Sequence, residues 1–334
     1  MQPRKAPVLV APDAFKGTLT ATAVAAAIAR GLRAGGWPDV DLCPLGDGGE
    51  GTAEALAATL GGGVSVLARV HDPVGREIDA EFLLVEDGRS AIVEVAAASG
   101  AGLVAAAERD ASAAWAASTR GTGELLVAAA RTGAQQLLLA AGGSATTDGG
   151  AGAIAAIEEE NGLGKAAILV LCDVRTPWER AAAVFAPQKG ADPPAVRRLQ
   201  RRLARLAARL PSDPRGRPLT GAAGGLAGGL WAAFGARLEP GAAFVLDAVG
   251  FNERMRAAHA VVLGEGRIDA STLQGKLVWE AATRCRQGGV PCFAIAGERA
   301  LDAFDARLLD LQMVLEGSTP AAIATAASRI VAAL

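Results

Sequence analysis

The feature that most constrains the fold is a short apolar segment followed by a turn of glycine and acidic or hydroxyl residues, which recurs along the chain. Each apolar segment has the length of a buried strand, and the arrangement is typical of proteins that alternate strands and helices. The repeats are VLVAPDAFKGT (8–18), DVDLCPLGDGGEGT (39–52), LLLAAGGSATTDGGAG (137–152), ILVLCDV (168–174) and VVLGEGRID (261–269). Ligands of open parallel sheets bind beyond the carboxyl ends of the strands. The pattern therefore predicts an α/β fold with a site for a polyanion and a metal ion.

The two ends of the chain are predicted to form parallel α/β structure, and the region between them differs. Val8–Ala11 and Ala260–Leu263 have the composition of buried strands, and Ala21–Ala34 that of a helix ended by glycines. Residues 64–95 instead alternate apolar and polar side chains between turn signals, which predicts an antiparallel meander. We therefore expect one discontinuous domain, residues 1–67 with 265–334, and a second α/β domain, residues 68–264, inserted into it.

Composition and charge exclude several classes of function. The 334-residue chain has a net charge of −2 and a pI near 5.9, which argues against a nucleic-acid-binding protein. Its one basic run, Arg197–Arg205, has leucines at helical spacing and is typical of a solvated helix face. No apolar stretch reaches the roughly 20 residues that span a bilayer, and the N-terminus lacks the features of a signal peptide. We therefore expect no nucleic-acid partner and no membrane partner.

The cysteines and histidines point to a reducing compartment and away from two kinds of site. The four cysteines show neither metal-binding spacing nor a disulfide framework, so a cytoplasmic location is expected. With only two histidines, a histidine-rich metal site or a Ser-His-Asp hydrolase is not expected. The first strand–helix turn also lacks the GxGxxG fingerprint of dinucleotide-binding proteins.

Two turns near the N-terminus carry the first candidate residues. Asp13 and Lys16 follow the first strand, where a lysine and free amides at a helix start can bind phosphate. A surface lysine and a helix cap explain this turn about equally well. In the second turn, two glycines permit close backbone approach, and Asp47 and Glu50 suit Mg²⁺, which prefers a few carboxylates together with phosphate oxygens. The alternative for the second turn is an acidic helix start.

The most distinctive turn is residues 142–152. Ser144, Thr146 and Asp148 lie in it among small residues, and such loops wrap phosphate with backbone amides. A packing turn would need no hydroxyls. Later turns add further candidates: Asp173 closes a buried strand, Lys189 lies in a loop of small residues, and Arg267, Asp269 and Lys276 follow the last repeat. Phosphoryl transfer needs positioning, cations, a metal and a proton acceptor, so these residue types together favour a small-molecule kinase.

Seven of these motifs, in this order, resemble the bacterial glycerate kinases of the short, two-domain type. The motifs are PDAFKGTLTA, PLGDGGEGTAEAL, GTGELL, GGSATTDGGAG, CDV, FAPQKGA and GEGRIDASTLQGK, and they extend from residue 8 to about residue 297 with the segments around them. The resemblance implies ATP-dependent phosphorylation of D-glycerate, most often at the 2-hydroxyl, giving 2-phosphoglycerate and ADP. It also implies a discontinuous Rossmann-like parallel-sheet domain with an inserted flavodoxin-like α/β domain.

The resemblance, together with the residue types in the turns, predicts roles for individual residues; Gly48, Gly49, Arg267 and the choice of proton acceptor rest on the residue types alone. Proton acceptors and phosphate-positioning residues form the predicted catalytic set: Asp148, Asp269, Lys16 and Asp47. Residues that contact the substrate or ATP form the binding set: Asp13, Gly48, Gly49, Ser144, Thr146, Lys189, Arg267 and Lys276. Mg²⁺ ligands form the metal set: Asp47, Glu50 and Asp173. Either Asp148 or Asp269 is the expected proton acceptor.

Three points stay open at the level of the sequence. Phosphorylation of another short hydroxy acid, or ligand binding without turnover, would use the same donor-side motifs. The protein is expected to be a monomer or a homodimer. The segment Ile157–Lys165 is shorter than its counterpart in the family, so the resemblance does not fix the geometry of the inserted domain around it.

Overall fold

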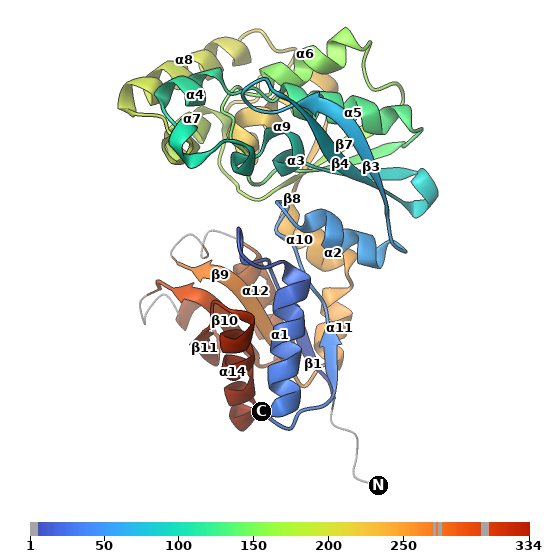
Figure 1. Cartoon of the computed structure of the whole chain (residues 1–334), viewed down its shortest axis with the longest axis vertical. Helices are drawn as coiled ribbons and strands as arrows, with labels where there is room; N and C mark the ends of the chain where they lie inside the picture. Colours follow the sequence, from blue (N-terminus) through green and yellow to red (C-terminus); the bar gives the residue numbers. More distant parts are fainter. Residues whose placement is uncertain (1–5, 270–271, 273–275, 302–306) are drawn as a thin grey trace. The chain divides into compact units, whose positions relative to one another are not determined.

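The computed structural model is an α/β protein with two sheets, and it describes residues 6–269, 272, 276–301 and 307–334 (Figure 1). Contacts between residues divide the chain into two compact units. Unit 1 consists of residues 1–47 and 242–334, and unit 2 of residues 48–241. The α/β class predicted from the strand–turn repeats is therefore confirmed. None of the helices in the described ranges is long and apolar enough to span a membrane.

Unit 1 is built on a parallel sheet of five strands in the order β11-β10-β9-β1-β2. The strands are β1 (Val8–Pro12), β2 (Val40–Leu42), β9 (Ala260–Ile268), β10 (Cys292–Arg299) and β11 (Met313–Glu316). The helices are α1 (Ala21–Ala34), α10 (Gly241–Ala248), α11 (Phe251–Ala257), α12 (Leu277–Gly288) and α14 (Pro320–Ile330). Apolar residues of α1 and α14 form one core with the central strands. Gly31 permits this packing, because a Cβ there would lie 2.1 Å from the carbonyl oxygen of Ala324 in α14.

Unit 2 contains a mixed sheet whose six strands lie in chain order. The strands are β3 (Val64–His71), β4 (Glu77–Val85), β5 (Ser90–Glu94), β6 (Gln136–Ala140), β7 (Ala167–Cys172) and β8 (Arg237–Pro240). The first three pair antiparallel, so the predicted meander is confirmed, and the last four pair in parallel. The sheet changes from antiparallel to parallel where the alternating apolar pattern of the sequence gives way to continuous apolar strands.

The helices of unit 2 pack around two apolar cores. They are α2 (Thr52–Thr59), α3 (Val95–Ser99), α4 (Ala111–Ala116), α5 (Arg120–Arg131), α6 (Ala151–Glu159), α7 (Ala181–Phe185), α8 (Pro193–Ala207) and α9 (Leu226–Phe234). Short 3₁₀ turns lie at Glu86–Gly88, Ala101–Leu103, Ala106–Glu108, Trp178–Arg180, Pro187–Lys189, Ala222–Gly225 and, in unit 1, Val331–Ala333. One core lies on the sheet, and the smaller one joins α4, α7 and α8 around Trp178.

The contact-based units differ in their boundaries from the predicted domains. Helix α2, predicted in the discontinuous domain, packs against β4 and β5 of unit 2. Residues 260–264, predicted in the inserted domain, pair with β1 as part of β9. Both differences arise because sheet pairing over long sequence separations, which local composition does not encode, decides where each segment belongs. Division into separately folding domains stays a prediction.

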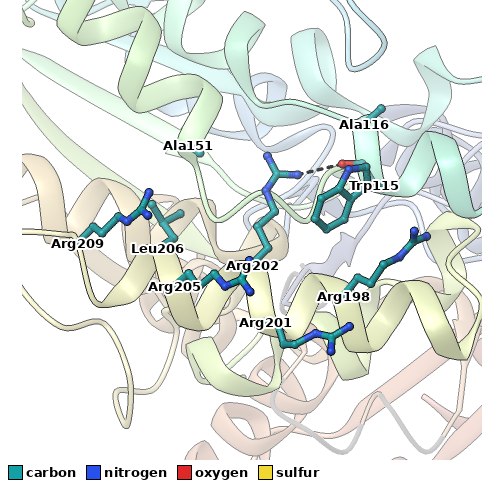
Figure 2. Close-up of a pocket in the computed structure, with 9 residues that line it drawn as sticks. All are labelled: Trp115, Ala116, Ala151, Arg198, Arg201, Arg202, Arg205, Leu206 and Arg209. Carbon is teal, nitrogen blue, oxygen red and sulfur yellow. Dashed lines mark hydrogen bonds between the residues drawn. The ribbon is translucent and has the colours of Figure 1, made fainter.

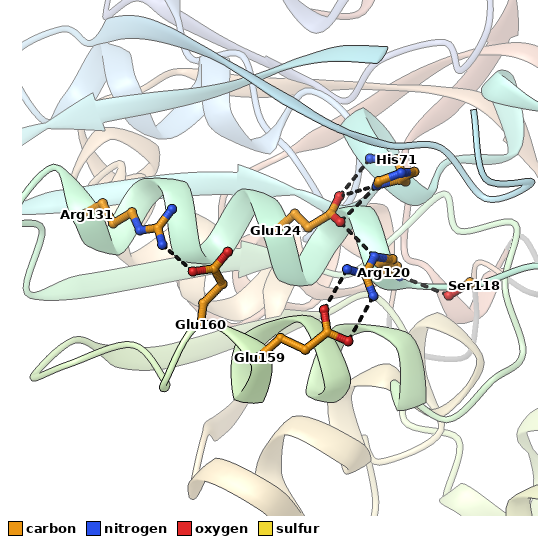
Figure 3. A network of polar contacts seen from close by, with 7 residues as sticks. All are labelled: His71, Ser118, Arg120, Glu124, Arg131, Glu159 and Glu160. Atoms are coloured by element: carbon orange, nitrogen blue, oxygen red, sulfur yellow. Dashed lines mark hydrogen bonds and ion pairs between the residues drawn. The ribbon is translucent and has the colours of Figure 1, made fainter. Parts of the chain in front are cut away.

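The short segment after α6 forms a regular connection held by arginines of α5 (Figure 3). Strand β6 precedes α6 in the sequence and β7 follows it, and the two strands pair in parallel, as in an ordinary strand–helix–strand unit. Arg120 donates both terminal nitrogens to Glu159, at 3.2 and 2.7 Å, and its Nε to Glu124 at 2.9 Å. Arg131 pairs with Glu160. Because the same Glu124 accepts the backbone amide of His71 at 2.8 Å, the network joins β3, α5 and α6.

Candidate active site

Acidic side chains gather in unit 1 where strand β1 ends beside β9. Asp13 directly follows β1, and its backbone amide donates to the carbonyl of Gly264 in β9 at 2.9 Å. The Asp13 side chain is buried, and one of its oxygens accepts the amide of Ala14 at 2.7 Å. Glu265 is the next residue of β9 and is also largely buried. Parallel pairing of these two strands therefore brings two carboxylates to one edge of the sheet.

Two lysines face these carboxylates. The Nζ of Lys16 lies 2.7 Å from an oxygen of the buried Asp47. The Nζ of Lys276 lies 3.9 Å from an oxygen of Glu265, whose other oxygen accepts the hydroxyl of Thr272 at 3.2 Å. The two lysines thus neutralise only part of the negative charge of Asp13, Asp47 and Glu265. Acidic and basic side chains lie together at this end of unit 1.

Burial and mutual repulsion hold protons on two of these carboxyls more tightly than usual. Burial is the main reason that the pKa of Asp13 lies well above its ordinary value, and the nearby Asp47 raises it further while Lys16 lowers it. Burial likewise raises the pKa of Glu265 to about 7, against the opposing effect of Lys276. A carboxyl with a pKa near neutrality can exchange a proton with a substrate at physiological pH.

A cavity of about 410 Å³ opens over these residues. Its volume lies within the range of small-molecule sites. The described residues that line it all belong to unit 1: Asp13, Ala14, Phe15, Lys16, Thr18, Glu265, Gly266, Arg267, Lys276, Gly297, Glu298 and Ser318. The cavity therefore joins four residues of the predicted site to Glu265, which the sequence analysis did not single out.

Arg267 and Asp269 form an ion pair outside the buried acidic group. The Nε of Arg267 lies 3.2 Å from Asp269, and a terminal nitrogen lies 3.0 Å from Glu298. Asp269 is not among the described residues that line the cavity. Residues 270–271 and 273–275 of the motif GEGRIDASTLQGK lie outside the described residues.

In unit 2, Lys189 is the central cation of the glycine-rich turn. The turn follows β6, and the buried Nζ of Lys189 donates to the hydroxyl of Ser144 at 2.9 Å and to the carbonyl of Thr146 at 2.5 Å. Burial lowers the pKa of Lys189 to about 8, although Asp173 and Asp148 oppose this shift. The structure thus brings five predicted residues of unit 2 into one cluster.

The glycines before α2 allow the backbone to approach this cluster. A Cβ on Gly142 would lie 2.6 Å from the Cα of Gly49 and 3.2 Å from a carboxylate oxygen of Asp173. Gly48 has a φ of +95°, and a Cβ there would lie 3.0 Å from the carbonyl oxygen of Leu171. Small residues are therefore required at these positions by geometry, whether or not a ligand binds.

Asp148 differs from the other predicted catalytic residues because its carboxylate is fully buried and saturated with hydrogen bonds. One oxygen accepts the amide and the hydroxyl of Thr119, at 2.9 and 2.8 Å, and the amide of Gly152 at 3.1 Å. The other accepts the amide of Gly150 at 3.0 Å. These bonds tie the glycine-rich turn to the start of α5, which indicates that Asp148 positions the turn.

We therefore predict that Asp148→Asn destabilises the protein. An asparagine side chain offers one acceptor oxygen and one NH₂ group, so at least one buried donor loses its partner, at about 1–3 kcal/mol each. The Tm should fall by several degrees. Thermal unfolding of Asp148→Asn beside Asp192→Asn, a helix cap in the same unit, measures this effect. An unchanged Tm with kcat lowered 100-fold or more would restore Asp148 as the proton acceptor.

Thr146 carries an unusual polar group. Its hydroxyl is the one buried side-chain polar atom without a hydrogen-bond partner in the described part of the chain. An unpartnered buried hydroxyl costs about 1–3 kcal/mol of stability. Such a group beside Lys189 indicates a site whose hydrogen bonding is completed by a ligand.

We predict that Thr146→Val leaves stability unchanged or improves it, while it weakens the enzyme. Valine has nearly the same shape and removes only the unpartnered hydroxyl, so the Tm should stay or rise. If a ligand completes this hydrogen bond, kcat/KM should fall about tenfold, which corresponds to about 1.4 kcal/mol. Thr146→Ser keeps the hydroxyl and is the matched control. A lower Tm for Thr146→Val would show that the hydroxyl has a structural partner.

The predicted metal ligands differ in burial and position. Asp47 is buried and paired with Lys16, whereas Glu50 is exposed. Asp173 lies next to Gly142 in unit 2. No group of three or more histidine, cysteine, aspartate or glutamate side chains is arranged to hold a metal ion, as far as the described residues show. Mg²⁺ often takes one or two protein carboxylates and completes its shell with phosphate oxygens and water, so buried carboxylates such as Asp13 and Asp47 suit it chemically.

Sequence reasoning missed two residues near these clusters, Glu265 and Glu94, and the role of a third, Thr119. Glu265 lies inside a quoted motif, but its burial depends on pairing between β9 and β10. Glu94, at the end of β5, accepts the amide of Ala53 at 2.9 Å. Its side chain therefore caps the N-terminus of α2 from a distant part of the sequence. The sequence indicates Thr119 only as a weaker candidate in a turn at a helix start, and its support of Asp148, 29 residues later, was missed. The available signals were weak: Glu94 ends a strand, Thr119 precedes a helix, and Glu265 follows the predicted end of a strand at Leu263.

Carboxylates, lysines and glycine-rich turns at the carboxyl ends of parallel strands define an α/β enzyme that handles phosphate groups. The model of the glycerate kinase family matches residues 8–160 and 157–330. The chain is 38% identical over 327 residues to the glycerate kinase of Halalkalibacterium halodurans (87% of this chain and 85% of that protein). It is 35% identical over 327 residues to the glycerate 2-kinase of Escherichia coli (87% and 84%).

A solved structure gives the same result. A crystal structure assigned to glycerate kinase 2 of Salmonella typhimurium covers 99% of this chain and 98% of its own, with 33% identity and a TM-score of 0.79. The chain therefore belongs to the glycerate kinase family, and it is a kinase. The family match breaks into two parts at residues 157–160, where the sequence analysis found the short segment.

Proposed function

We propose that this enzyme transfers the γ-phosphoryl group of ATP to the 2-hydroxyl of D-glycerate, giving 2-phosphoglycerate and ADP. The observation that carries the proposal is the family match over residues 8–330 together with relatives named glycerate kinase and glycerate 2-kinase. The buried Lys189, which is hydrogen-bonded to the glycine-rich turn, and the partly neutralised carboxylates of unit 1 supply the residue types that this reaction needs.

In the reaction, the bond between the γ-phosphorus and the β–γ bridging oxygen breaks, and a bond between the glycerate oxygen and phosphorus forms. The hydroxyl proton passes to a carboxylate, and ADP leaves with the bridging oxygen. Lys189 holds its charged Nζ near the turn of residues 142–152, where phosphate oxygens would replace neutral hydrogen-bond partners. Lys16 is a second candidate for the phosphates, and Lys276 or Arg267 for the substrate carboxylate. Electrostatic stabilisation of this kind dominates catalysis of phosphoryl transfer.

For the proton acceptor, we propose Glu265. It lines the 410 Å³ cavity, and its pKa near 7 matches the operating range of a general base. Asp269, one of the two residues predicted for this role, stays the second candidate. Asp148 is better explained as a positioning residue, because four donors already occupy its oxygens.

Mg²⁺ would neutralise charge on the transferring phosphate groups. We propose Asp13 and Asp47 as its candidate ligands in unit 1. Both carboxylates are buried; Asp13 lines the cavity, and Asp47 pairs with Lys16, which also lines it. Glu50 and Asp173, predicted for the same role, stay candidates in unit 2.

The finer structural and cellular predictions are also proposals. A Rossmann-like description of unit 1 is supported by its five parallel strands, although their order is the one found in flavodoxin-type sheets. The chain order of the strands in unit 2 offers no support for a flavodoxin-like description. Four buried, free cysteine thiols support a reducing compartment such as the cytoplasm. A monomer or homodimer stays the proposed assembly.

An acceptor panel tests the proposed function. ADP formation is measured with D-glycerate, L-glycerate, glycolate and D-lactate, each with Mg²⁺ and ATP. We expect D-glycerate to give the highest kcat/KM by at least tenfold. A higher value for another acid would show a kinase of a different hydroxy acid. Tight ATP binding without ADP formation from any acceptor would show a ligand-binding protein.

A further inference from the structure

Helix α8 presents a group of arginines that the proposed kinase reaction does not use. Ala195, Leu199, Leu203 and Ala207 form its buried face, at intervals of four residues. On another side of the helix, five arginines line one hollow of about 780 Å³ together with Trp115 and Leu206 (Figure 2). The arginines are Arg198, Arg201, Arg202, Arg205 and Arg209. We call this hollow the arginine hollow.

The charge of the arginine hollow is not neutralised by the protein. Throughout the described ranges, none of its five arginines is paired with a carboxylate, whereas arginines such as Arg120 and Arg254 are. Like charges at this spacing on a helix repel each other and reduce helix stability. The chain as a whole carries a net charge of −2, so the hollow is a local exception to its charge balance.

Two of the guanidinium groups are held in place by α4. Arg202 donates a terminal nitrogen to the carbonyl of Trp115 at 2.9 Å, and its guanidinium carbon lies 5.3 Å from the centre of the indole ring. The guanidinium carbon of Arg198 lies 5.7 Å from the same ring. These contacts orient the two side chains before any ligand arrives, which reduces the entropy lost on binding.

The size and chemistry of the hollow select a class of ligand. Its volume falls within the range of small-molecule sites, and the guanidinium fork matches phosphate oxygens in pairs. Five cations within one hollow suit a ligand with several phosphate groups better than one with a single carboxylate. We propose that the arginine hollow binds a short oligophosphate chain, either free or carried by a nucleoside, at a site separate from the Lys189 cluster.

The separation from the Lys189 cluster rests on the residues that line each site. The hollow is lined by residues of α4 and α8, by Arg209 just beyond α8 and by the first residue of α6, and by none of the residues predicted for ATP or glycerate. Ala116 and Ala151 line it three residues before Thr119 and three residues after Asp148. A ligand in the hollow would therefore contact the segments that flank the Thr119–Asp148 hydrogen bonds without replacing them.

Isothermal titration calorimetry with sodium tripolyphosphate tests the proposal on the full-length protein. We expect saturable binding that weakens with added salt, and Arg201→Gln/Arg205→Gln should raise the Kd at least tenfold, the equivalent of about 1.4 kcal/mol. Arg180→Gln/Arg197→Gln is the matched control, because it removes two exposed charges of the same unit that do not line the hollow. Its Kd should stay within about twofold. Lys189→Met alters the proposed phosphate site of the kinase and leaves the hollow unchanged. Separate titrations of this variant with ATP and with tripolyphosphate therefore show whether the hollow binds a nucleoside-linked or a free oligophosphate.

Any of five results would overturn the proposal. Tripolyphosphate fails to bind, or Arg201→Gln/Arg205→Gln binds it as the unaltered protein does. The control pair weakens binding as much as the test pair, which would indicate general surface charge. The KM for ATP rises in parallel with the Kd for tripolyphosphate, which would place the hollow in the ATP site. A 20-nucleotide RNA binds more than tenfold tighter than tripolyphosphate and loses this affinity in the variant, which would make the surface a nucleic-acid footprint. Apart from the KM for ATP, these outcomes are read from binding without turnover, so they do not depend on the proposed kinase activity.

Discussion

Replacement of Lys189 by methionine should lower kcat/KM by about 10²–10³-fold while the protein stays folded. The buried ammonium donates to Ser144 and Thr146 within the turn that we propose binds phosphate. Loss of one preorganised donor at developing charge typically costs this much activity. Lys165→Met, which removes an exposed lysine of the same unit, is the control and should keep full activity.

Stability should respond differently from activity in Lys189→Met. The pKa of Lys189, lowered to about 8 by burial, shows that the folded protein disfavours the charged form. Methionine removes that penalty but leaves a hydroxyl and a carbonyl without a donor, so we expect the free energy of unfolding to change by less than about 2 kcal/mol. The folded protein binds fewer protons than the unfolded chain between about pH 8 and the ordinary lysine pKa of about 10.5, so Lys189 makes stability rise with pH in that window. Lys189→Met should lack this rise. A large loss of stability with unchanged kcat/KM in the surviving folded fraction would make Lys189 structural.

Glu265→Gln should lower kcat by about 10²–10⁴-fold, the usual contribution of a general base. In the unaltered enzyme, kcat/KM should rise with pH through about 7, where the Glu265 carboxyl loses its proton. It should fall above about pH 8, where Lys189 loses its charge. The variant should lose the acid limb and keep the alkaline limb. Glu253→Gln, an exposed position in unit 1, is the control and should keep the full profile.

The stability of Glu265→Gln gives a second, independent readout. Because burial raises the pKa of Glu265, the folded protein binds more protons than the unfolded chain between the ordinary glutamate pKa and about pH 7. Its charge therefore destabilises the protein increasingly across that window, by up to about 3 kcal/mol above pH 7. At pH 8 the variant should melt at a higher temperature than the unaltered protein, and near pH 4 the two should coincide. Equal kcat in both proteins, with Asp269→Asn impaired 100-fold, would move the role to Asp269.

Helices and strands that depend mainly on residues close together in the sequence were predicted correctly from local patterns. The predicted helix Ala21–Ala34 is observed with the same bounds, because alanines and a buried stripe favour a helix and Gly35 ends it. The meander follows from alternating side chains in β3 and β4. Strand β9 runs from Ala260 to Ile268, five residues beyond the predicted end at Leu263, because its pairing with β10 continues through two glycines.

The environment of each carboxylate could not be predicted in this way. Asp148 and Glu265 are both acidic residues in glycine-containing motifs that follow an apolar segment, and nothing near them in the sequence shows which accepts four hydrogen bonds. Thr119 reaches Asp148 through packing of α5 against α6. Glu265 owes its raised pKa to burial between neighbouring strands. Long-range pairing therefore decided which of the predicted polar residues suits catalysis.

The most direct test of the account is to identify the product of the reaction by ³¹P NMR. The enzyme is incubated with Mg²⁺, ATP and D-glycerate, and the spectrum distinguishes phosphate on the 2-oxygen from phosphate on the 3-oxygen. For the unaltered enzyme we expect a 2-phosphoglycerate signal that grows together with the ADP signal. For Lys189→Met we expect no such signal over the same time. A 3-phosphoglycerate signal, or ADP formed without any phosphorylated glycerate, would contradict it.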